Sequence, residues 1–165
     1  MREDAPPERA DDGKPDHAGV RLPPPLIFLG FLVAGLWIDS PWFAGQLATP
    51  LPTAAGGLLA ALGIGLILAA ARPHKKAGTN LEPWKPTTAI ITDGLYRYSR
   101  NPIYLGMALT QAGLAIAGGS LAALATLAGS VAVIQFYVIA HEERYLEAKF
   151  GQPYRDYKAR VRPWI

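Results

Sequence analysis

The feature that most constrains this sequence is a long stretch, from Pro102 to Ala140, that contains no Asp, Glu, Lys, Arg or His. The chain has 165 residues, of which 50% are hydrophobic and only 18% are charged. A soluble domain is usually nearer a quarter charged. A charge-free run of this length excludes an ordinary soluble globule and a largely disordered chain, so the sequence predicts an integral membrane protein with one domain.

Four apolar segments can be separated, and we expect each to be a helix because backbone groups in lipid must be hydrogen-bonded internally. They cover residues 22–38, 51–71, 103–117 and 121–140, the last two divided by Gly118, Gly119 and Ser120. The predicted fold is an all-α membrane bundle of four transmembrane helices, followed by a cytoplasmic helical segment over residues 141–165. Three spans, with the last apolar run partly re-entrant, is the alternative.

Basic residues set the expected orientation. Lys and Arg number four in residues 1–21, six in residues 72–101 and six in residues 141–165. The two short connections between spans, residues 39–50 and 118–120, contain none. Four spans place all three segments on one side, which should be the cytoplasm, with both termini there. The Ala- and Gly-rich chain without an organellar targeting signal favours a bacterial inner membrane.

The segment before the first span is rich in Pro, Asp and Glu. We expect residues 1–21 to be a disordered cytoplasmic tail rather than part of a cleaved signal peptide, and residues 22–165 to form the membrane domain. Glycines such as Gly63, Gly106 and Gly113 should let the helices pack closely. The chain has no Cys, which excludes disulfides, Cys-based zinc sites and a thiol nucleophile. The net charge of +3 reflects basic loops near acidic lipid and does not indicate nucleic acid.

Polar residues gather in two segments, Thr87–Gly106 and His141–Trp164, each at the end of a predicted span. In the first, Arg97 and Arg100 alternate with tyrosines ahead of a helix that should begin at Pro102, with Asn101 as its N-cap. This pattern fits a surface that binds an anion and an aromatic ring. An interfacial belt of anchoring Tyr and Arg side chains is the alternative.

The second segment begins with His141, Glu142 and Glu143. A carboxylate turned inward could accept hydrogen bonds from paired hydroxyls such as those of a ribose, although solvated surface is the alternative. Neighbouring helical residues point about 100° apart, so we expect only one of the two glutamates to face a ligand. His141 could act as a general base, but it lacks the second His that a helical metal site needs. The sequence predicts no metal site.

The string from Gly94 to Gly106, which contains Arg100-Asn101-Pro102-Ile103-Tyr104, resembles the signature of the isoprenylcysteine carboxyl methyltransferase and phospholipid methyltransferase superfamily. The family pattern continues with a Glu-Glu pair, here Glu142-Glu143. It ends with Phe-Gly-x-x-Tyr-x-x-Tyr, here residues 150–157, and a basic finish. The resemblance covers the chain from about Gly78 to the C-terminus, and it implies a membrane methyltransferase that uses S-adenosylmethionine (SAM).

The resemblance also implies which residues bind and react. The cofactor pocket would be lined by Thr88, Ala89, Ile90, Ile91, Tyr96, Asn101, Pro102, Ile103, Tyr104 and Glu142. Arg100 would hold the methionine carboxylate. His141 or Glu143 would assist an amine or thiol acceptor that must lose a proton, whereas a carboxylate acceptor needs no base.

Two departures from the family pattern bear on the acceptor. Asn101 stands where the eukaryotic prenylcysteine enzymes have His, and Val138 stands where they have a substrate-contacting Arg. The second departure puts a prenylcysteine carboxylate in doubt. We expect an amphiphilic or lipid-like acceptor that enters from the bilayer, its identity and the oligomeric state being left open by the sequence. A sterol-type reductase relative that uses NADPH, and a non-catalytic membrane scaffold, remain the alternatives.

Overall fold

The computed structural model describes residues 16–40 and 53–165. Most of the predicted tail, the loop after the first apolar segment and the first two residues of the second predicted span lie outside the described residues. The helices are α1 (Pro24–Ile38), α2 (Thr53–Ala77), α3 (Pro102–Ala117), α4 (Leu121–Val133), α5 (Ala140–Phe150) and α6 (Gln152–Arg160). Two further elements are η1, a short 3-10 helix over Gly94–Arg97, and η2, a π-helical segment over Ile134–Ile139. The described part contains no strand, which confirms the all-α prediction.

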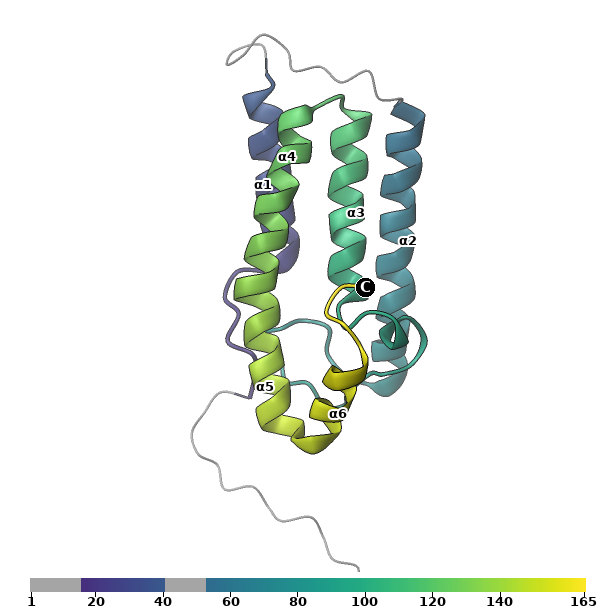
Figure 1. Ribbon diagram of the computed structural model, residues 1–165, viewed down its shortest axis with the longest axis vertical. Helices are drawn as coiled ribbons and strands as arrows, with labels where there is room; N and C mark the ends of the chain where they lie inside the picture. The colour runs from purple at the N-terminus through teal and green to yellow at the C-terminus, as the bar shows by residue number, and fades with distance from the viewer. Residues whose placement is uncertain (1–15, 41–52) are drawn as a thin grey trace, which may run out of the picture.

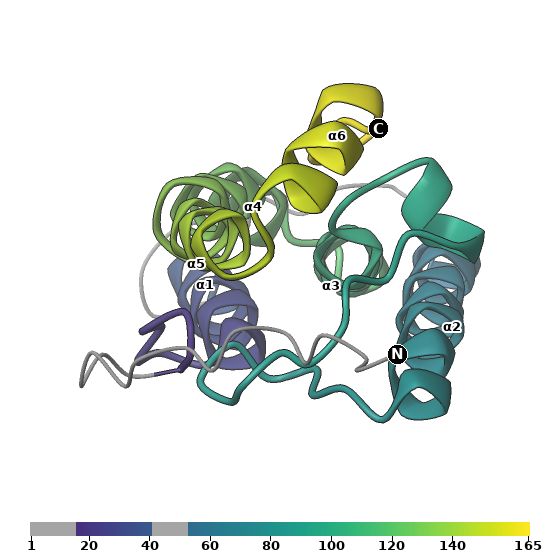
Figure 2. The same cartoon turned by 90° about the horizontal axis from the view of Figure 1, so that it is seen from below.

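The helices pack as two pairs, α2 against α3 and α1 against α4 (Figures 1 and 2). α4, η2 and α5 form one continuous helix from Leu121 to Phe150, so the helix after the last apolar run extends past the apolar part of the bundle. The turn at Gly118–Ser120 and the C-terminal end of α1 lie together at the opposite end, where Asp39 Oδ2 accepts hydrogen bonds from Ser120 Oγ (2.5 Å) and the Ala122 amide (3.0 Å).

Two helices, Thr53–Ala77 and Leu121–Phe150, are long and apolar enough to cross a membrane. Only 22% and 28% of their most apolar windows are buried inside the protein, so they differ from the core helices of a soluble domain. α1 and α3 are also apolar but have 15 and 16 residues, which at 1.5 Å per residue is less than a bilayer core of about 30 Å. Outward-facing leucines such as Leu29 (53% exposed) and Leu58 (64% exposed) also suit lipid contact.

Glycines hold α2 and α3 together at close range, as expected for small residues in membrane helices. Gly63 faces Gly106, and Gly56 faces Gly113, with the pairs two turns apart along the seam. A Cβ atom at Gly113 would lie 2.3 Å from the Ala60 amide nitrogen and 2.7 Å from the Gly56 carbonyl oxygen. Because these neighbours are backbone atoms, the helices would have to separate to accept even a methyl group.

We expect Gly113→Ala to destabilise the bundle by about 1–3 kcal/mol, because the added methyl overpacks the seam. The matched control is Gly57→Ala on the outer face of α2, where a Cβ would meet nothing within 4 Å. This control should be neutral or stabilising by up to about 1 kcal/mol, since Ala is the better helix former. Thermal unfolding of the two variants in detergent checks the difference, and equal melting temperatures would contradict the seam.

The predicted disordered tail is wrong for residues 16–21, which pack against the bundle. Val20 is 1% exposed, and the Arg21 amide donates a hydrogen bond to Tyr137 Oη at 3.1 Å. Asp16 pairs with Lys149 on α5. The overall composition of the tail concealed a short apolar segment around Val20 that covers the core between α1 and η2.

The C-terminal segment folds back onto the start of α3 and closes this end of the bundle (Figure 1). Gly151, at φ 62°, turns the chain from α5 into α6 in a conformation that favours glycine. After α6 the Arg162 carbonyl accepts a hydrogen bond from the Arg100 amide, and Trp164 Nε1 donates to Gln135 Oε1 at 2.7 Å. The two polar segments of the sequence therefore meet in space.

Candidate functional site

A cavity of about 130 Å³ lies where the two polar segments meet, at the end of the bundle that carries α5 and α6. Its walls come from the polar end of α2, the loop that follows, η1, the first turn of α3, α5 and α6. The lining residues are Ala18, His74, Asn80, Leu81, Glu82, Pro83, Thr87, Ala89, Ile90, Ile91, Tyr96, Arg100, Asn101, Ile103, Tyr104, Glu142, Glu143, Tyr145, Leu146, Tyr154 and Tyr157.

Tyr104 and Glu142 form the polar centre of one wall. Tyr104 stands in the first turn of α3 and is 7% exposed, and its hydroxyl donates a hydrogen bond of 2.6 Å to Glu142 Oε1. The long helix carries no charge as far as Ala140, and Glu142 lies just beyond this uncharged part. Burial raises the pKa of Glu142 to about 7; the hydrogen bond from Tyr104 offsets part of the rise, and the charge of Glu143 adds to it.

Glu143 belongs to a second cluster, with Arg100 and Lys158. The Arg100 guanidinium is 9% exposed and pairs with Glu143, while Lys158 Nζ lies 3.1 Å from the other carboxylate oxygen. Arg100 also donates to the backbone carbonyls of Lys158 and Val161. All three guanidinium nitrogens are therefore engaged within the protein, which joins the start of α3 to α5 and to the C-terminal segment.

Asn101 occupies the N-cap position of α3, but its side chain makes no capping hydrogen bond there. Instead Nδ2 donates to the Pro163 carbonyl at 2.9 Å, and the Ser99 hydroxyl donates to the same carbonyl at 3.3 Å. The expected side-chain cap is therefore wrong, and the amide group is instead turned toward the returning C-terminal segment, to which it donates. Asn101 still lines the cavity, and it also fixes the C-terminal segment against the helix start.

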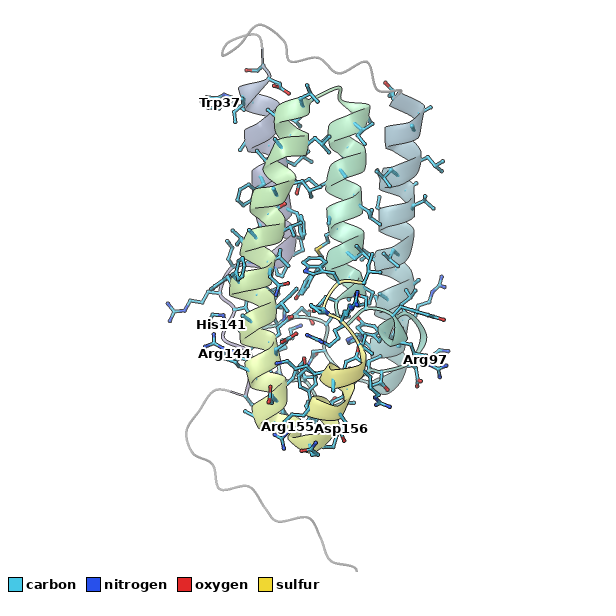
Figure 3. All side chains as sticks on the ribbon, in the orientation of Figure 1. Trp37, Arg97, His141, Arg144, Arg155 and Asp156 are labelled. Atoms are coloured by element: carbon cyan, nitrogen blue, oxygen red, sulfur yellow. The ribbon has the colours of Figure 1, made fainter. Side chains whose placement is uncertain are left out.

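The structure brings most of the residues implied by the resemblance into the cavity wall. Those that line it are Ala89, Ile90, Ile91, Tyr96, Arg100, Asn101, Ile103, Tyr104, Glu142 and Glu143. Thr88, Pro102 and His141 do not line it. Thr88 donates its amide to Thr79 Oγ1, the Pro102 side chain is fully buried, and His141 projects from the outer side of α5, away from α6 (Figure 3).

Both glutamates line the cavity. Their side chains do point in different directions, Glu142 toward Tyr104 and Glu143 toward Arg100. The cavity is lined by the first turn of α3, by α5 and by α6. Glu142 and Glu143 can therefore both belong to its wall although their side chains point in different directions. That only one of the two faces a ligand stays a prediction.

Three buried tyrosines form an aromatic wall beside these acids. Tyr96 in η1 packs with Tyr154 and Tyr157 of α6, and Tyr157 Oη donates a hydrogen bond of 2.8 Å to the Tyr96 carbonyl. Burial raises the pKa of Tyr96 and Tyr154, and raises that of Tyr157 to about 12, so all three stay neutral. Tyr154 and Tyr157 were not expected to contact a ligand, although their spacing of three residues places them on one helix face.

Other lining residues were missed as well. His74, Asn80 and the neighbouring loop residues, and Tyr145 carry no motif, and Ala18 stands in a segment expected to be disordered. Only the fold brings them to the cavity. In residues 16–40 and 53–165 no group of three His, Asp or Glu side chains is arranged to hold a metal ion.

The fold and the cavity define a helical membrane protein with a polar, aromatic-walled binding site at one end of its apolar helices. A model of the phospholipid methyltransferase family matches residues 51–153, and the chain belongs to this family. This confirms the resemblance of the Arg-Asn-Pro-x-Tyr-x-Gly string. The chain is therefore a membrane methyltransferase that uses SAM, which disfavours the reductase and scaffold alternatives.

Two curated relatives share part of the sequence. An uncharacterized protein of Haemophilus influenzae is 50% identical over 48 residues, which are 29% of this chain and 75% of that protein. The protein-S-isoprenylcysteine O-methyltransferase of Schizosaccharomyces pombe is 34% identical over 74 residues, which are 44% of this chain and 30% of that protein. No solved structure matches the chain.

Proposed function

We propose that this methyltransferase holds SAM in the cavity between α3, α5 and α6 and methylates an amphiphilic, lipid-like acceptor at its carboxyl, amine or thiol group. The observation that supports this most directly is the Tyr104–Glu142 hydrogen bond on the cavity wall, because it unites the two motif segments. We further propose four transmembrane segments, a bacterial inner membrane and a cytoplasmic cavity. The described basic segments, residues 16–21, 78–101 and 141–165, lie at one end of the bundle, which supports this orientation (Figure 1).

The cavity residues suit the parts of SAM. An ionised Glu142 can accept hydrogen bonds from the two ribose hydroxyls, and its charge favours the sulfonium. The wall of Tyr96, Tyr154 and Tyr157 offers aromatic surface to a planar base. SAM supplies an electrophilic methyl group, so the protein has mainly to align donor and acceptor and to exclude water.

The remaining motif residues take positioning roles in this proposal. Arg100 and Glu143 neutralise each other and fix α5 and the C-terminal segment against α3, so the guanidinium is already engaged where the resemblance implied a bond to the methionine carboxylate. His141 donates from Nδ1 to the Tyr137 carbonyl (2.5 Å) and faces away from the cavity. A carboxylate acceptor, which needs no base, therefore fits the site more simply than an amine.

The acceptor class is tested with purified protein, SAM carrying a labelled methyl group and a bacterial lipid extract. We expect label in the organic phase, in products whose lability to mild base separates methyl esters from methylated amines and thioethers. Label confined to water-soluble products would contradict a lipid-like acceptor. The variant Glu142→Gln provides the control for transfer that does not depend on the cavity.

SAM affinity should depend on pH, because the proposed contact needs an ionised Glu142 whose pKa in the unliganded protein is about 7. The pKa is raised, so the carboxyl is protonated below pH 7 and must lose its proton when SAM binds. We expect affinity to rise about tenfold per unit as pH increases toward 7, and to level off above it. Calorimetry from pH 5.5 to 8 measures this dependence, and Glu142→Gln should lose it, leaving only the titration of SAM itself. A wild-type profile identical to that of the variant would contradict the assignment.

A further inference from the structure

His74 reaches the cavity from a helix that carries no motif residue. It stands in the last turn of α2, three residues before the helix ends at Ala77. The centroid of its ring lies 5.3 Å from that of the Tyr96 ring, and the two planes are 58° apart. The residue lines the cavity. α2 and α5 lie on different sides of α3 (Figure 2), so His74 and Glu142 approach the cavity from different directions.

The two ring nitrogens of His74 have different surroundings. Nδ1 is buried and forms no hydrogen bond within the protein. The backbone of Ala70, one turn earlier, interacts with the ring. Because the backbone of the preceding turn offers the ring an acceptor, we assign the proton to Nδ1. Nε2 then holds the lone pair, and it is the ring nitrogen left to accept a hydrogen bond from a ligand in the cavity.

The surroundings of the ring suit a flat, uncharged group that donates a hydrogen bond. Ile90, Ile91 and Tyr96 also line the cavity and belong to one apolar cluster, whereas Glu142 and Glu143 lie on α5. Of the parts of SAM, the sulfonium and the ribose hydroxyls suit the acids. The adenine base suits the aromatic and aliphatic surface, and its exocyclic amine is a neutral donor.

We propose that His74 is a specificity-determining residue, whose Nε2 accepts a hydrogen bond from the exocyclic amine of the SAM adenine. This inference rests on the proposed function, since it requires SAM in this cavity. It gives α2 a role in recognising the nucleobase, in addition to its role in packing. A site built around such an acceptor discriminates against a base that lacks the donor, because Nε2 would be left without a partner.

The test uses S-adenosylhomocysteine and its analogue in which unsubstituted purine replaces adenine, titrated by calorimetry into the full-length protein in detergent. We expect the wild type to bind the analogue about tenfold more weakly. His74→Leu should bind both ligands within about twofold of each other, at an affinity near that of the wild type for the analogue. His74→Gln, which retains an acceptor oxygen, should recover part of the preference. Lys75→Leu, at the exposed neighbour on α2, is the matched control and should keep the full preference.

Two results would overturn the inference while leaving the proposed function intact. One is equal binding of the two ligands by the wild type, a measurement that does not depend on any variant folding. The other is an undiminished preference in His74→Leu. Failure of the wild type to bind S-adenosylhomocysteine at all would instead overturn the proposed function, and this inference with it.

Discussion

Glu142→Gln is expected to weaken SAM binding by about 10- to 100-fold. This is the loss expected when the ribose hydroxyls no longer donate hydrogen bonds to an ionised group. The substitution removes the charge but keeps an acceptor oxygen for Tyr104, whose hydroxyl would otherwise be buried without a partner. The variant should therefore remain folded, and calorimetry on the detergent-purified protein measures the affinity directly.

The matched control is Glu147→Gln on the same helix. Glu147 pairs with Lys158, its side chain is 37% exposed, and it does not line the cavity. This variant should bind SAM like the wild type. Equal losses in the two variants would mean that the effect reflects the charge of α5 in general, and unchanged affinity in both would remove Glu142 from the site.

Tyr104→Phe gives a graded version of the same test. It removes the 2.6 Å hydrogen bond that lowers the pKa of Glu142, so the carboxyl should titrate at a still higher pH. SAM affinity at pH 7 should then fall by a few fold and recover at higher pH. A loss that is the same at every pH would point instead to direct contact between the Tyr104 hydroxyl and SAM.

Arg100→Gln is expected to destabilise the protein by about 3–5 kcal/mol, because it leaves the largely buried Glu143 carboxylate without its main partner. It also removes hydrogen bonds to the Lys158 and Val161 carbonyls, so the C-terminal segment should become accessible to proteases before the bundle unfolds. Thermal unfolding and limited proteolysis in detergent measure the two effects.

Arg97→Gln is the control for this substitution. Arg97 pairs with Asp93 nearby in the chain, but the two side chains are 69% and 82% exposed, and such pairs contribute at most about 1 kcal/mol. We expect the Arg97 variant to unfold like the wild type. If both variants lost stability equally, the Arg100–Glu143 pair would not be what holds the C-terminal segment in place.

The arrangement within η2 shows why the site could not be derived from helical periodicity alone. Ile134 and Ile139 are both almost fully buried although they are five residues apart, a spacing that a π turn brings onto one face. Every residue after this turn is rotated relative to a regular helix. Which of Glu142 and Glu143 meets Tyr104 is therefore decided by a local π turn, which the sequence of residues 134–139 does not indicate.

The sequence by itself determined the apolar helices, the turn at Gly118–Ser120 and the family, because hydropathy, turn residues and motif spacing are local properties of the chain. It also indicated that the Arg-Asn-Pro-x-Tyr string and the Glu-Glu pair act together, through the resemblance. Only the tertiary structure decided that Arg100 is committed to Glu143 and Asn101 to Pro163, that residues 16–21 cover the core, and that His74 enters the cavity. These contacts join residues far apart in the chain, and they depend on how the helices pack and rotate against one another, which no local pattern encodes.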